Sequence, residues 1–223
     1  MKIVLISDTH GKHSQIVVPE GDMIIHAGDI CNSGKSMNEV NRFLDWYQSL
    51  SHKHKIMIAG NHDFPFEDDF LAGGDYVKTY TNGSVIYLDD SGVEIEGKKI
   101  WGSPVQPWFH SWAFNRYRGK DIQQHWDLIP SDIEILITHG PPYGIGDLLI
   151  PKHRKIGQDP NVGCEDLLNT IESRLKSLKL HVFGHIHSGY GIVKNLNPPM
   201  FINASVLDDD YQSVNKPIVI EYE

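Results

Sequence analysis

Five short apolar runs in this sequence each end in a loop that carries histidine, aspartate or asparagine. The runs are Lys2–Ser7, Met23–Ala27, Lys55–Ala59, Ile133–Ile137 and His181–Phe183. Continuous apolar runs of this length are typical of strands that are buried inside a mixed sheet. Because the ends of adjacent strands in an open α/β sheet converge on a crevice, the pattern predicts an α/β chain whose polar residues gather at one edge.

Two segments between these runs have the spacing of helices. Ser36–Leu50 opens with Ser36-Met37-Asn38-Glu39, which fits a capping box, and Glu165–Leu178 repeats apolar residues every three or four positions. Further strands are predicted at Val85–Leu88, Val93–Ile95, Lys99–Trp101, Ile192–Lys194, Met200–Ile202 and Ile218–Tyr222, with a hairpin turn at Glu96-Gly97. We interpret Gly102–Pro130 as an irregular, aromatic segment over one face. No repeat or interdomain linker is visible, so we expect a single domain spanning residues 1–223.

The net charge, the apolar stretches and the cysteine count limit which partners and which compartment are expected. The formal net charge is −9, from 29 acidic and 20 basic residues. This charge opposes loose binding to a nucleic-acid backbone or an anionic membrane, so we expect neither stable nucleic-acid binding nor a membrane partner. The run after Met1 is too short for a signal peptide, and no apolar stretch approaches the roughly 20 residues of a membrane span. Cys31 and Cys164 allow one bridge at most, so a reducing cytoplasm is the expected compartment.

The residues at the ends of the apolar runs are of the types that divalent metals prefer, namely carboxylate, imidazole and amide oxygen. They form five blocks: Asp8-Thr9-His10, Gly28-Asp29, Gly60-Asn61-His62-Asp63, His139 and Gly184-His185-Ile186-His187. In Asp8-x-His10 and His185-x-His187 the paired residues project to the same side of an extended chain. The glycines at positions 28, 60 and 184 each precede a ligand, where the backbone must turn tightly or pass close to another group. Together the blocks predict a metal site.

The order of these blocks resembles the full signature of calcineurin-like metallophosphoesterases. Further motifs are similar to those of the metallophosphoesterase-domain (MPPED) group: Thr138-His139-Gly140-Pro141-Pro142-x-Gly144, Trp112-Ala113-Phe114, Gly189-Tyr190-Gly191 and Asn203-Ala204-Ser205. The similarity extends from Lys2 to about Asp208. It implies an α/β fold built as a two-layer mixed β-sandwich flanked by helices, with the metals at the strand ends.

The resemblance also implies a role for each site residue. One metal would be held by Asp8, His10 and His187, the other by Asn61, His139 and His185, and Asp29 would bridge them. We expect two divalent ions, Mn²⁺ by preference, although Fe, Co, Ni or Zn suit the same donors. A hydroxide that bridges the metals would attack phosphorus, and His62 would protonate the leaving oxygen. Asp63 would either fix the tautomer of His62 or only cap the local backbone.

The expected activity is metal-dependent hydrolysis of small phosphodiesters. The resemblance to the metallophosphoesterase-domain group suggests cyclic nucleotides as substrates, which the ligands alone do not. The same metal core serves phosphomonoesterases and protein phosphatases, so this remains an alternative. A scaffold that has lost its metals is a third alternative, and the complete ligand set disfavours it. The oligomeric state stays open.

Some residues of the sequence have two interpretations. The aromatic stretch Trp108–Tyr117 could stack a nucleobase or an aryl leaving group, or it could cover the sheet edge or form a dimer contact. Arg116 and Arg118 could bind phosphate, although ion pairs with nearby acids are the expected role. The other eight histidines, at positions 13, 26, 52, 54, 110, 125, 153 and 181, are assigned to surface or core. Among these, His13 could approach the site because it follows the first ligand loop.

Overall fold

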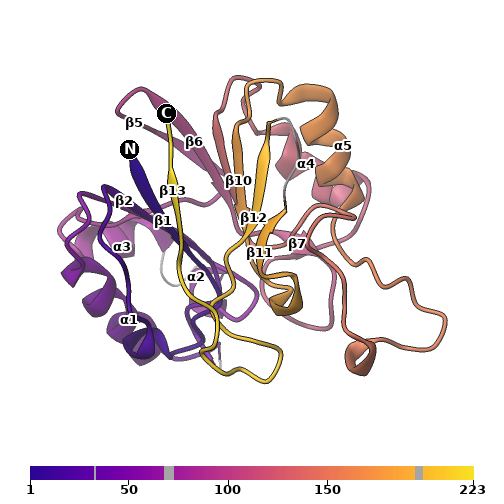
Figure 1. Cartoon of the computed structure of the whole chain (residues 1–223), viewed down its shortest axis with the longest axis horizontal. Helices are drawn as coiled ribbons and strands as arrows, with labels where there is room; N and C mark the ends of the chain where they lie inside the picture. Colours follow the sequence, from indigo (N-terminus) through magenta and orange to yellow (C-terminus); the bar gives the residue numbers. More distant parts are fainter. Residues whose placement is uncertain (33, 68–72, 194–197) are drawn as a thin grey trace.

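The computed structural model describes residues 1–32, 34–67, 73–193 and 198–223, and its two large sheets pack face to face (Figure 1). The first sheet has the order β13-β1-β2-β3-β4 and is parallel except for β13. Its strands are β1 (Lys2–Ile6), β2 (Met23–Ala27), β3 (His54–Ile58), β4 (Ile86–Tyr87) and β13 (Ile218–Glu221). The predicted strands of this sheet are confirmed to within one or two residues at their ends.

The second sheet has the order β11-β12-β10-β9-β6-β5, with antiparallel pairs at both of its edges. Its strands are β5 (Ser91–Ile95), β6 (Lys98–Ser103), β9 (Ile135–Thr138), β10 (Leu180–Phe183), β11 (Gly191–Val193) and β12 (Met200–Asn203). The turn between β5 and β6 is at Glu96-Gly97, as predicted, and both residues have the positive φ that such hairpins use. The last residue of the predicted strand Ile192–Lys194 lies outside the described residues.

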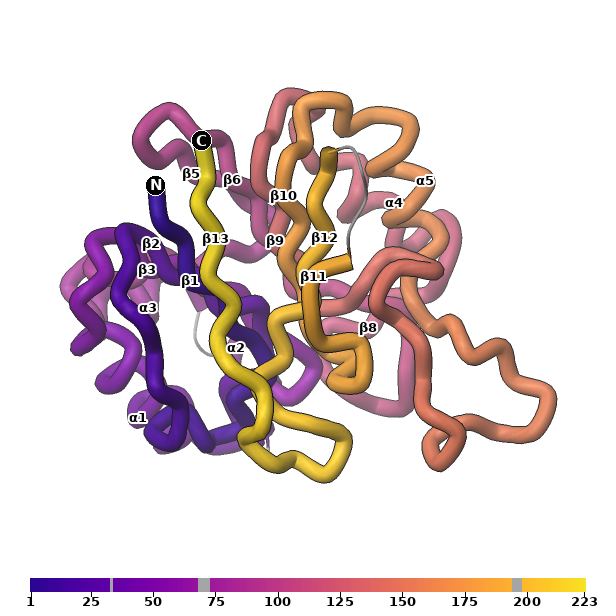
Figure 2. Tube along the Cα trace, viewed as in Figure 1, coloured from indigo at the N-terminus to yellow at the C-terminus, as the bar shows by residue number. Residues whose placement is uncertain are grey.

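Three apolar layers hold this arrangement together. The inner layer lies between the two sheets, where Leu5 and Ile25 of the first sheet meet Ile137 and Val182 of the second. The outer face of the first sheet is covered by α1 (Met37–Ser49) and α3 (Gly73–Tyr80). The outer face of the second sheet is covered by α4 (Lys120–Asp127) and α5 (Glu165–Arg174). The predicted two-layer mixed sandwich with flanking helices is therefore confirmed, and the trace in Figure 2 shows its two halves.

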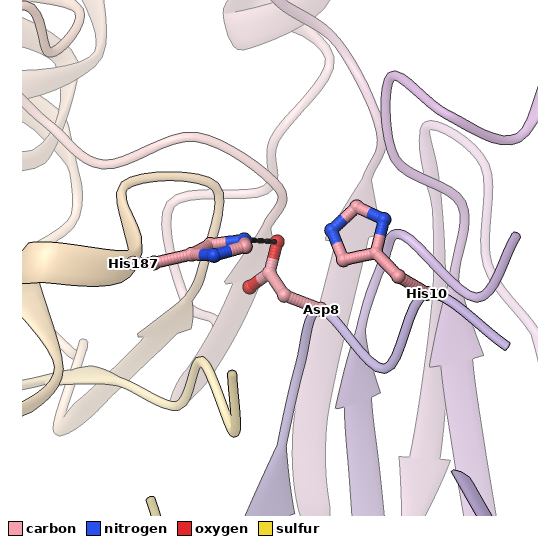
Figure 3. A group of neighbouring side chains, drawn as sticks. All are labelled: Asp8, His10 and His187. Carbon is pink, nitrogen blue, oxygen red and sulfur yellow. Dashed lines mark ion pairs between the residues drawn. The ribbon is translucent and has the colours of Figure 1, made fainter. Parts of the chain in front are cut away.

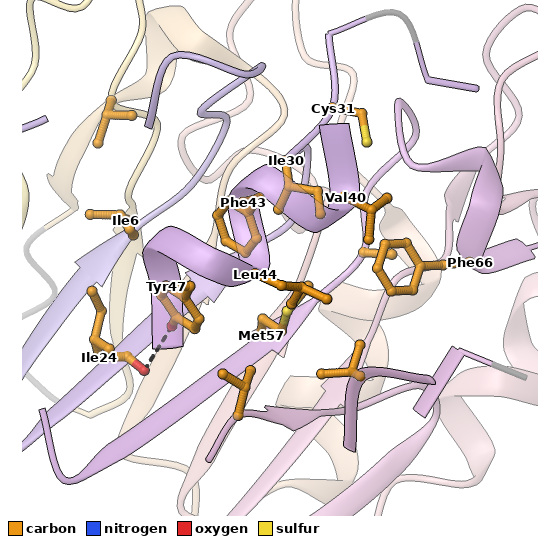
Figure 4. Packing of buried hydrophobic residues seen from close by; sticks show 14 of the residues in the cluster. Ile6, Ile24, Ile30, Cys31, Val40, Phe43, Leu44, Tyr47, Met57 and Phe66 are labelled. Carbon is orange, nitrogen blue, oxygen red and sulfur yellow. Dashed lines mark hydrogen bonds between the residues drawn. The ribbon is translucent and has the colours of Figure 1, made fainter. Parts of the chain in front are cut away.

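Helix α1 illustrates how the outer layers form. Val40, Phe43, Leu44 and Tyr47 recur at helical spacing and are fully buried against the sheet (Figure 4). The hydroxyl of Tyr47 lies 2.7 Å from the carbonyl of Ile56 and 3.1 Å from that of Ile24, so this buried polar group is satisfied. The helix is fixed to the sheet by both apolar contact and a hydrogen bond.

The predicted capping box is not formed. Ser36 precedes α1 but makes no side-chain capping hydrogen bond. The carboxylate of Glu39 instead accepts from the N–H of Asn32 at 3.2 Å. Its carboxylate therefore holds the loop that follows β2.

Several short elements were not predicted. These are α2 (Phe64–Glu67), α3, α4 and the two-residue strands β7 (Gln106–Pro107) and β8 (Asn115–Arg116). The segment Gly102–Pro130 is therefore less irregular than expected. Helix α4 buries only Ile122 and Trp126, too few apolar positions for a periodic signal. Three 3₁₀ turns complete the described structure: His13–Gln15, Pro151–His153 and His187–Gly189.

None of the helices formed by the described residues combines the length and apolarity required to cross a bilayer.

Candidate metal centre

The predicted ligands come together at the carboxyl ends of the strands in both sheets. Asp8 follows β1 and Asp29 follows β2, while His139 and His185 follow β9 and β10 of the opposite sheet. Asp8, Asp29 and His185 have φ values of 56°, 59° and 67°. The left-handed region is unfavourable for such residues, costing about 1–3 kcal/mol each, and such strain is found preferentially at functional sites. The backbone is held here in a conformation that aims the side chains.

The glycines before the ligands are required by close approach, as the sequence predicted. A Cβ on Gly184 would lie 2.1 Å from a carboxylate oxygen of Asp8. A Cβ on Gly60 would lie 2.4 Å from Oδ1 of Asp29. Any side chain at either position would displace a carboxylate of the site. The two glycines therefore allow the loops to approach these carboxylates.

The first cluster consists of Asp8, His10 and His187 (Figure 3). One ligand atom from each lies within 4.8 Å of the others, and Nε2 of His187 is 3.5 Å from Oδ1 of Asp8. Nε2 of His10 is buried and has no hydrogen-bond partner within the described part of the chain. A buried nitrogen without a partner is costly unless a ligand satisfies it. The donor set and this nitrogen fit a divalent cation.

The second cluster consists of Asp29, His139 and His185, with Asn61 beside them. Nε2 of His139 lies 2.9 Å from Oδ1 of Asn61 and 3.4 Å from Oδ1 of Asp29. The other oxygen of Asp29, Oδ2, lies 3.6 Å from Nε2 of His10 in the first cluster. Asp29 therefore presents one carboxylate oxygen to each cluster, an arrangement that suits a bridging ligand.

Three of the imidazoles are oriented in the same way. Nδ1 of His10 contacts the carbonyl of Cys31 at 3.1 Å, Nδ1 of His139 contacts that of Ala27 at 3.0 Å, and Nδ1 of His187 contacts that of Asp208 at 2.8 Å. Because a carbonyl can only accept, each Nδ1 carries the hydrogen and Nε2 is left to bind a cation. Such contacts fix both the tautomer and the ring orientation of metal-binding histidines.

Two carboxylate–imidazole pairs dominate the electrostatics of the site. Burial works to raise the pKa of Asp8, but the hydrogen bond and charge of His187 outweigh it and hold that pKa well below its usual range. Burial works to lower the pKa of His187, yet Asp8 raises it to about 9. Burial likewise works to raise the pKa of Asp29 and to lower that of His139. The attraction between the two side chains outweighs burial, so the pKa of Asp29 is lowered and that of His139 is raised to about 9. The pKa of His185 is lowered to about 3 by burial. Cations would therefore replace protons on two imidazoles.

His62 lies beside the two clusters, and its ring also forms a further group of possible metal ligands with His10 and Asp29. Its backbone N–H donates to Oδ1 of Asp29 at 2.8 Å, and its ring meets that of His10 edge-on with 4.6 Å between centroids. Its Nδ1 donates to the carbonyl of Asn32 at 2.9 Å. Nε2 is therefore the ring nitrogen that Asn32 does not engage.

Asp63 contacts the backbone. Its carboxylate accepts from the N–H groups of Ile30, Cys31 and Gly60 at 3.2, 2.9 and 2.8 Å. Burial, with the charge of Asp29, raises the pKa of Asp63 to about 6. Of the two roles considered from the sequence, these contacts correspond to capping of the ligand loops, and a direct part in catalysis stays a prediction.

The family model described as calcineurin-like phosphoesterase matches residues 1–189. This chain belongs to the calcineurin-like phosphoesterase family. Over 99% of its length it is 42% identical to metallophosphoesterase domain-containing protein 1 of Homo sapiens, covering 70% of that protein. It is 40% identical to a UPF0046 protein of Caenorhabditis elegans, covering 80% of that protein. The solved structure of an archaeal phosphodiesterase matches 99% of this chain and 100% of that chain, with 16% identity and a TM-score of 0.44, and adds nothing to this assignment.

This phosphoesterase is thus a metal-dependent phosphoester hydrolase, and its remaining contacts show how the ligands are held. The hydroxyl of Ser205 donates to Oδ2 of Asp8 at 2.7 Å and lies 2.7 Å from Oδ1 of Asn203. The amide of Asn203 donates to the carbonyl of Ile186 at 2.8 Å. The sequence assigns no role to the Asn203-Ala204-Ser205 motif. In the structure, this motif joins the first and last ligand loops.

Two buried histidines lie behind the ligands of the phosphoesterase. Nε2 of His26 contacts the hydroxyl of Thr9 at 3.1 Å, and Nε2 of His181 contacts the hydroxyl of Thr138 at 2.8 Å. Their assignment to the core is confirmed, because both are fully buried. His13 does not approach the site. It packs against Trp46, with 5.2 Å between ring centroids.

A cavity of about 790 Å³ opens above the two clusters. Its base is formed by site residues, and its walls by Trp108 and Phe109, by the loop from Pro141 to Gly163, and by Tyr211. Tyr211 has no signal in the sequence, yet its ring lies 4.8 Å from that of His10. The volume is typical of sites for small molecules.

The two arginines that follow the aromatic stretch have different roles. Arg116 contacts Glu67 at 3.5 Å, as its expected ion pair requires. Arg118 lines the cavity and donates to the carbonyls of Val162 and Gly163 at 2.8 Å each. Arg118 is therefore the one of the two that lines the cavity.

Proposed function

We propose that this phosphoesterase is a dinuclear phosphodiesterase acting on small diesters that carry an aromatic group, cyclic nucleotides among them. The observation that carries the proposal is the position of Asp29, with one oxygen directed to each cluster. Asp8, His10 and His187 would hold one ion, and Asn61, His139 and His185 the other. When bound, two cations supply Lewis-acid activation of water and charge neutralisation at phosphorus.

The donors themselves suggest which ions would bind. The set contains two carboxylates, one amide and four imidazoles, and no thiolate. Such a set suits Mn²⁺, our preferred ion, while Fe, Co, Ni and Zn remain compatible with it.

The residues of the chain itself would handle the proton and the ester groups. His62 would deliver a proton from Nε2 to the leaving oxygen, since its Nδ1 is engaged by Asn32. His62 lies beside His10, whereas Phe109 lies near His185 of the other cluster, with 6.1 Å between ring centroids. The two ester groups of a diester would therefore meet different walls of the cavity.

The aromatic wall supports the preference for aromatic ester groups. Trp108 and Phe109 both line the cavity and are about half exposed, at 51% and 49%. Tyr117 stacks on Trp108 with an interplanar angle of 4° and fixes the plane of that ring. A preset aromatic face suits a nucleobase or an aryl group.

Phosphomonoester hydrolysis is the second candidate, and one observation favours it. Arg118 and Lys155 both line the cavity, and cationic side chains suit the second negative charge of a monoester.

Hydrolysis of bis-p-nitrophenyl phosphate and p-nitrophenyl phosphate separates the two candidates. Metal-stripped protein would be assayed on both without metal, with added Mn²⁺ and, in parallel, with Fe, Co, Ni or Zn. We expect metal-dependent preference for the diester. Preference for the monoester would transfer the proposal to a phosphatase, and the absence of turnover with any of the five metals would contradict both.

A further inference from the structure

Trp112 lies against the proposed acid of the site. Its ring stacks on that of His62, with 4.1 Å between centroids and an interplanar angle of 25°. Among the described residues that line the cavity, His62 is present and Trp112 is not. Trp112 therefore contacts His62 without belonging to the cavity wall.

The other contacts of His62 leave its ring incompletely fixed. Within the described part of the chain, the ring makes one hydrogen bond, from Nδ1 to the carbonyl of Asn32, which sets the position of that nitrogen. A ring that is held at one atom can still tilt about that contact, and tilting moves Nε2. A flat aromatic neighbour restricts the tilt, because stacked rings stay close to parallel. Trp112 thus adds a stacked contact to the edge-on contact with His10, and the two contacts restrict the direction of Nε2.

The segment that carries Trp112 is fixed to the ligand loop. The N–H of Ala113 donates to the carbonyl of Asn61 at 3.2 Å, and the N–H of Phe114 donates to Oε1 of Glu67 at 2.8 Å. Trp112 also contacts the ring of Phe64, with 6.1 Å between centroids. The tryptophan and His62 therefore keep their relative positions, since both are attached to the loop that follows β3.

We propose that Trp112 is a positioning residue that holds the imidazole of His62 in the orientation needed for proton delivery to the leaving oxygen. This inference rests on the proposed role of His62. Loss of the stacked face should slow the reaction in proportion to its need for a proton, because a displaced acid transfers the proton less efficiently. Metal binding should be unaffected.

The test uses Trp112→Leu, which removes the flat face but keeps an apolar side chain, and Trp112→Phe, which keeps a face. The substrates are diaryl phosphates whose leaving phenols rise in pKa from p-nitrophenol to phenol. For the poorest leaving group, kcat should fall about tenfold in Trp112→Leu, with little change for p-nitrophenol. Trp112→Phe should stay close to the unmodified protein.

Two reference variants make the outcome decisive. Trp46→Leu removes another half-buried tryptophan, which packs on Phe43 in α1, and it should leave the dependence on the leaving group unchanged. His62→Ala should show the full dependence on the leaving group, and Trp112→Leu should add nothing to it in the double variant. Bound metal and thermal unfolding are measured for every variant, and Trp112→Met replaces Trp112→Leu if the latter does not fold.

The results separate the two proposals. If His62→Ala lacks a dependence on the leaving group, the role of His62 fails and the inference fails with it. If His62→Ala has that dependence but Trp112→Leu slows all substrates equally or not at all, the inference about Trp112 alone is overturned.

Discussion

The base of the cavity and its wall are built in opposite ways. His10 and Asp29 at the base are buried, and each is held by its neighbours through hydrogen bonds. Trp108 and Lys155 on the wall are exposed. The base can keep one geometry while the wall changes its side chains at little cost to the fold. We therefore propose that the buried part sets the reaction type and that the exposed part selects the ester.

Electrostatics explains why the base must be so strongly constrained. Two buried carboxylates in one site repel each other and lose their hydration, which is unfavourable unless cations compensate. In the metal-free state protonated His139 and His187 give partial compensation, as the raised pKa of each shows. The exposed side chains of the wall keep their hydration, so they need no such compensation.

The largest expected effect comes from replacing the shared ligand of the base. Asp29→Asn should lower turnover of every phosphoester by about a thousandfold or more, because cation stabilisation of the reaction is worth several kcal/mol. Steady-state kinetics with bound-metal analysis checks this. Asp132→Asn, at an exposed carboxylate that pairs with Lys99, is the matched control. Near-normal activity of Asp29→Asn would contradict the proposal that Asp29 is a ligand shared by the two metals.

Replacing His62 should have a smaller effect that depends on the substrate. His62→Ala should lower kcat by about a hundredfold for diesters with poor leaving groups, and less for p-nitrophenolate, since general acids contribute about 10²–10⁴ in rate. Bound metal should not change. An equal loss for all leaving groups would make His62 a residue that orients substrate.

A variant of the wall should change binding and leave the chemistry intact. Trp108→Ala should raise KM for aromatic diesters up to about tenfold, since aromatic stacking is worth about 0.5–1.5 kcal/mol. KM for dialkyl phosphates and kcat for all substrates should stay nearly constant. Leu128→Ala, at an exposed leucine that does not line the cavity, is the control. An equal effect on alkyl and aromatic diesters would contradict the stacking role.

The smallest effect is expected at the exposed cation of the wall. Arg118→Ala should change KM for the diester by less than about fivefold, because exposed charge pairs contribute up to about 1 kcal/mol. The effect should weaken further in added salt. A selective loss of monoester turnover in this variant would favour the phosphatase alternative.

The sequence predicted the base of the site better than its surroundings. The seven proposed ligands could be predicted from the sequence because they are of metal-binding type and directly follow apolar runs. The strands alone therefore bring them together. The stacking of Trp112 on His62 could not be predicted from the sequence, because it joins residues 50 positions apart through a loop without periodicity. Tyr211 likewise reaches His10 across the whole chain.

The role of Asp63 shows a different limit of sequence reasoning. Its position after His62 allowed either a contact with the imidazole or a backbone cap. Only the three-dimensional arrangement brings the N–H groups of Ile30 and Cys31 to its carboxylate. The same limit applies to the prediction of the fold. Helices α3 and α4 were not predicted because they depend on tertiary packing of a few apolar side chains.

The central claim is that two cations, joined by Asp29, are needed for turnover. The direct measurement is a titration of metal-stripped protein with Mn²⁺, in which bound metal and diester hydrolysis are followed together. The account predicts that activity rises to its maximum only as two ions bind per chain, and that Asp29→Asn never reaches it. Full activity with one ion per chain, or without any, would contradict the claim.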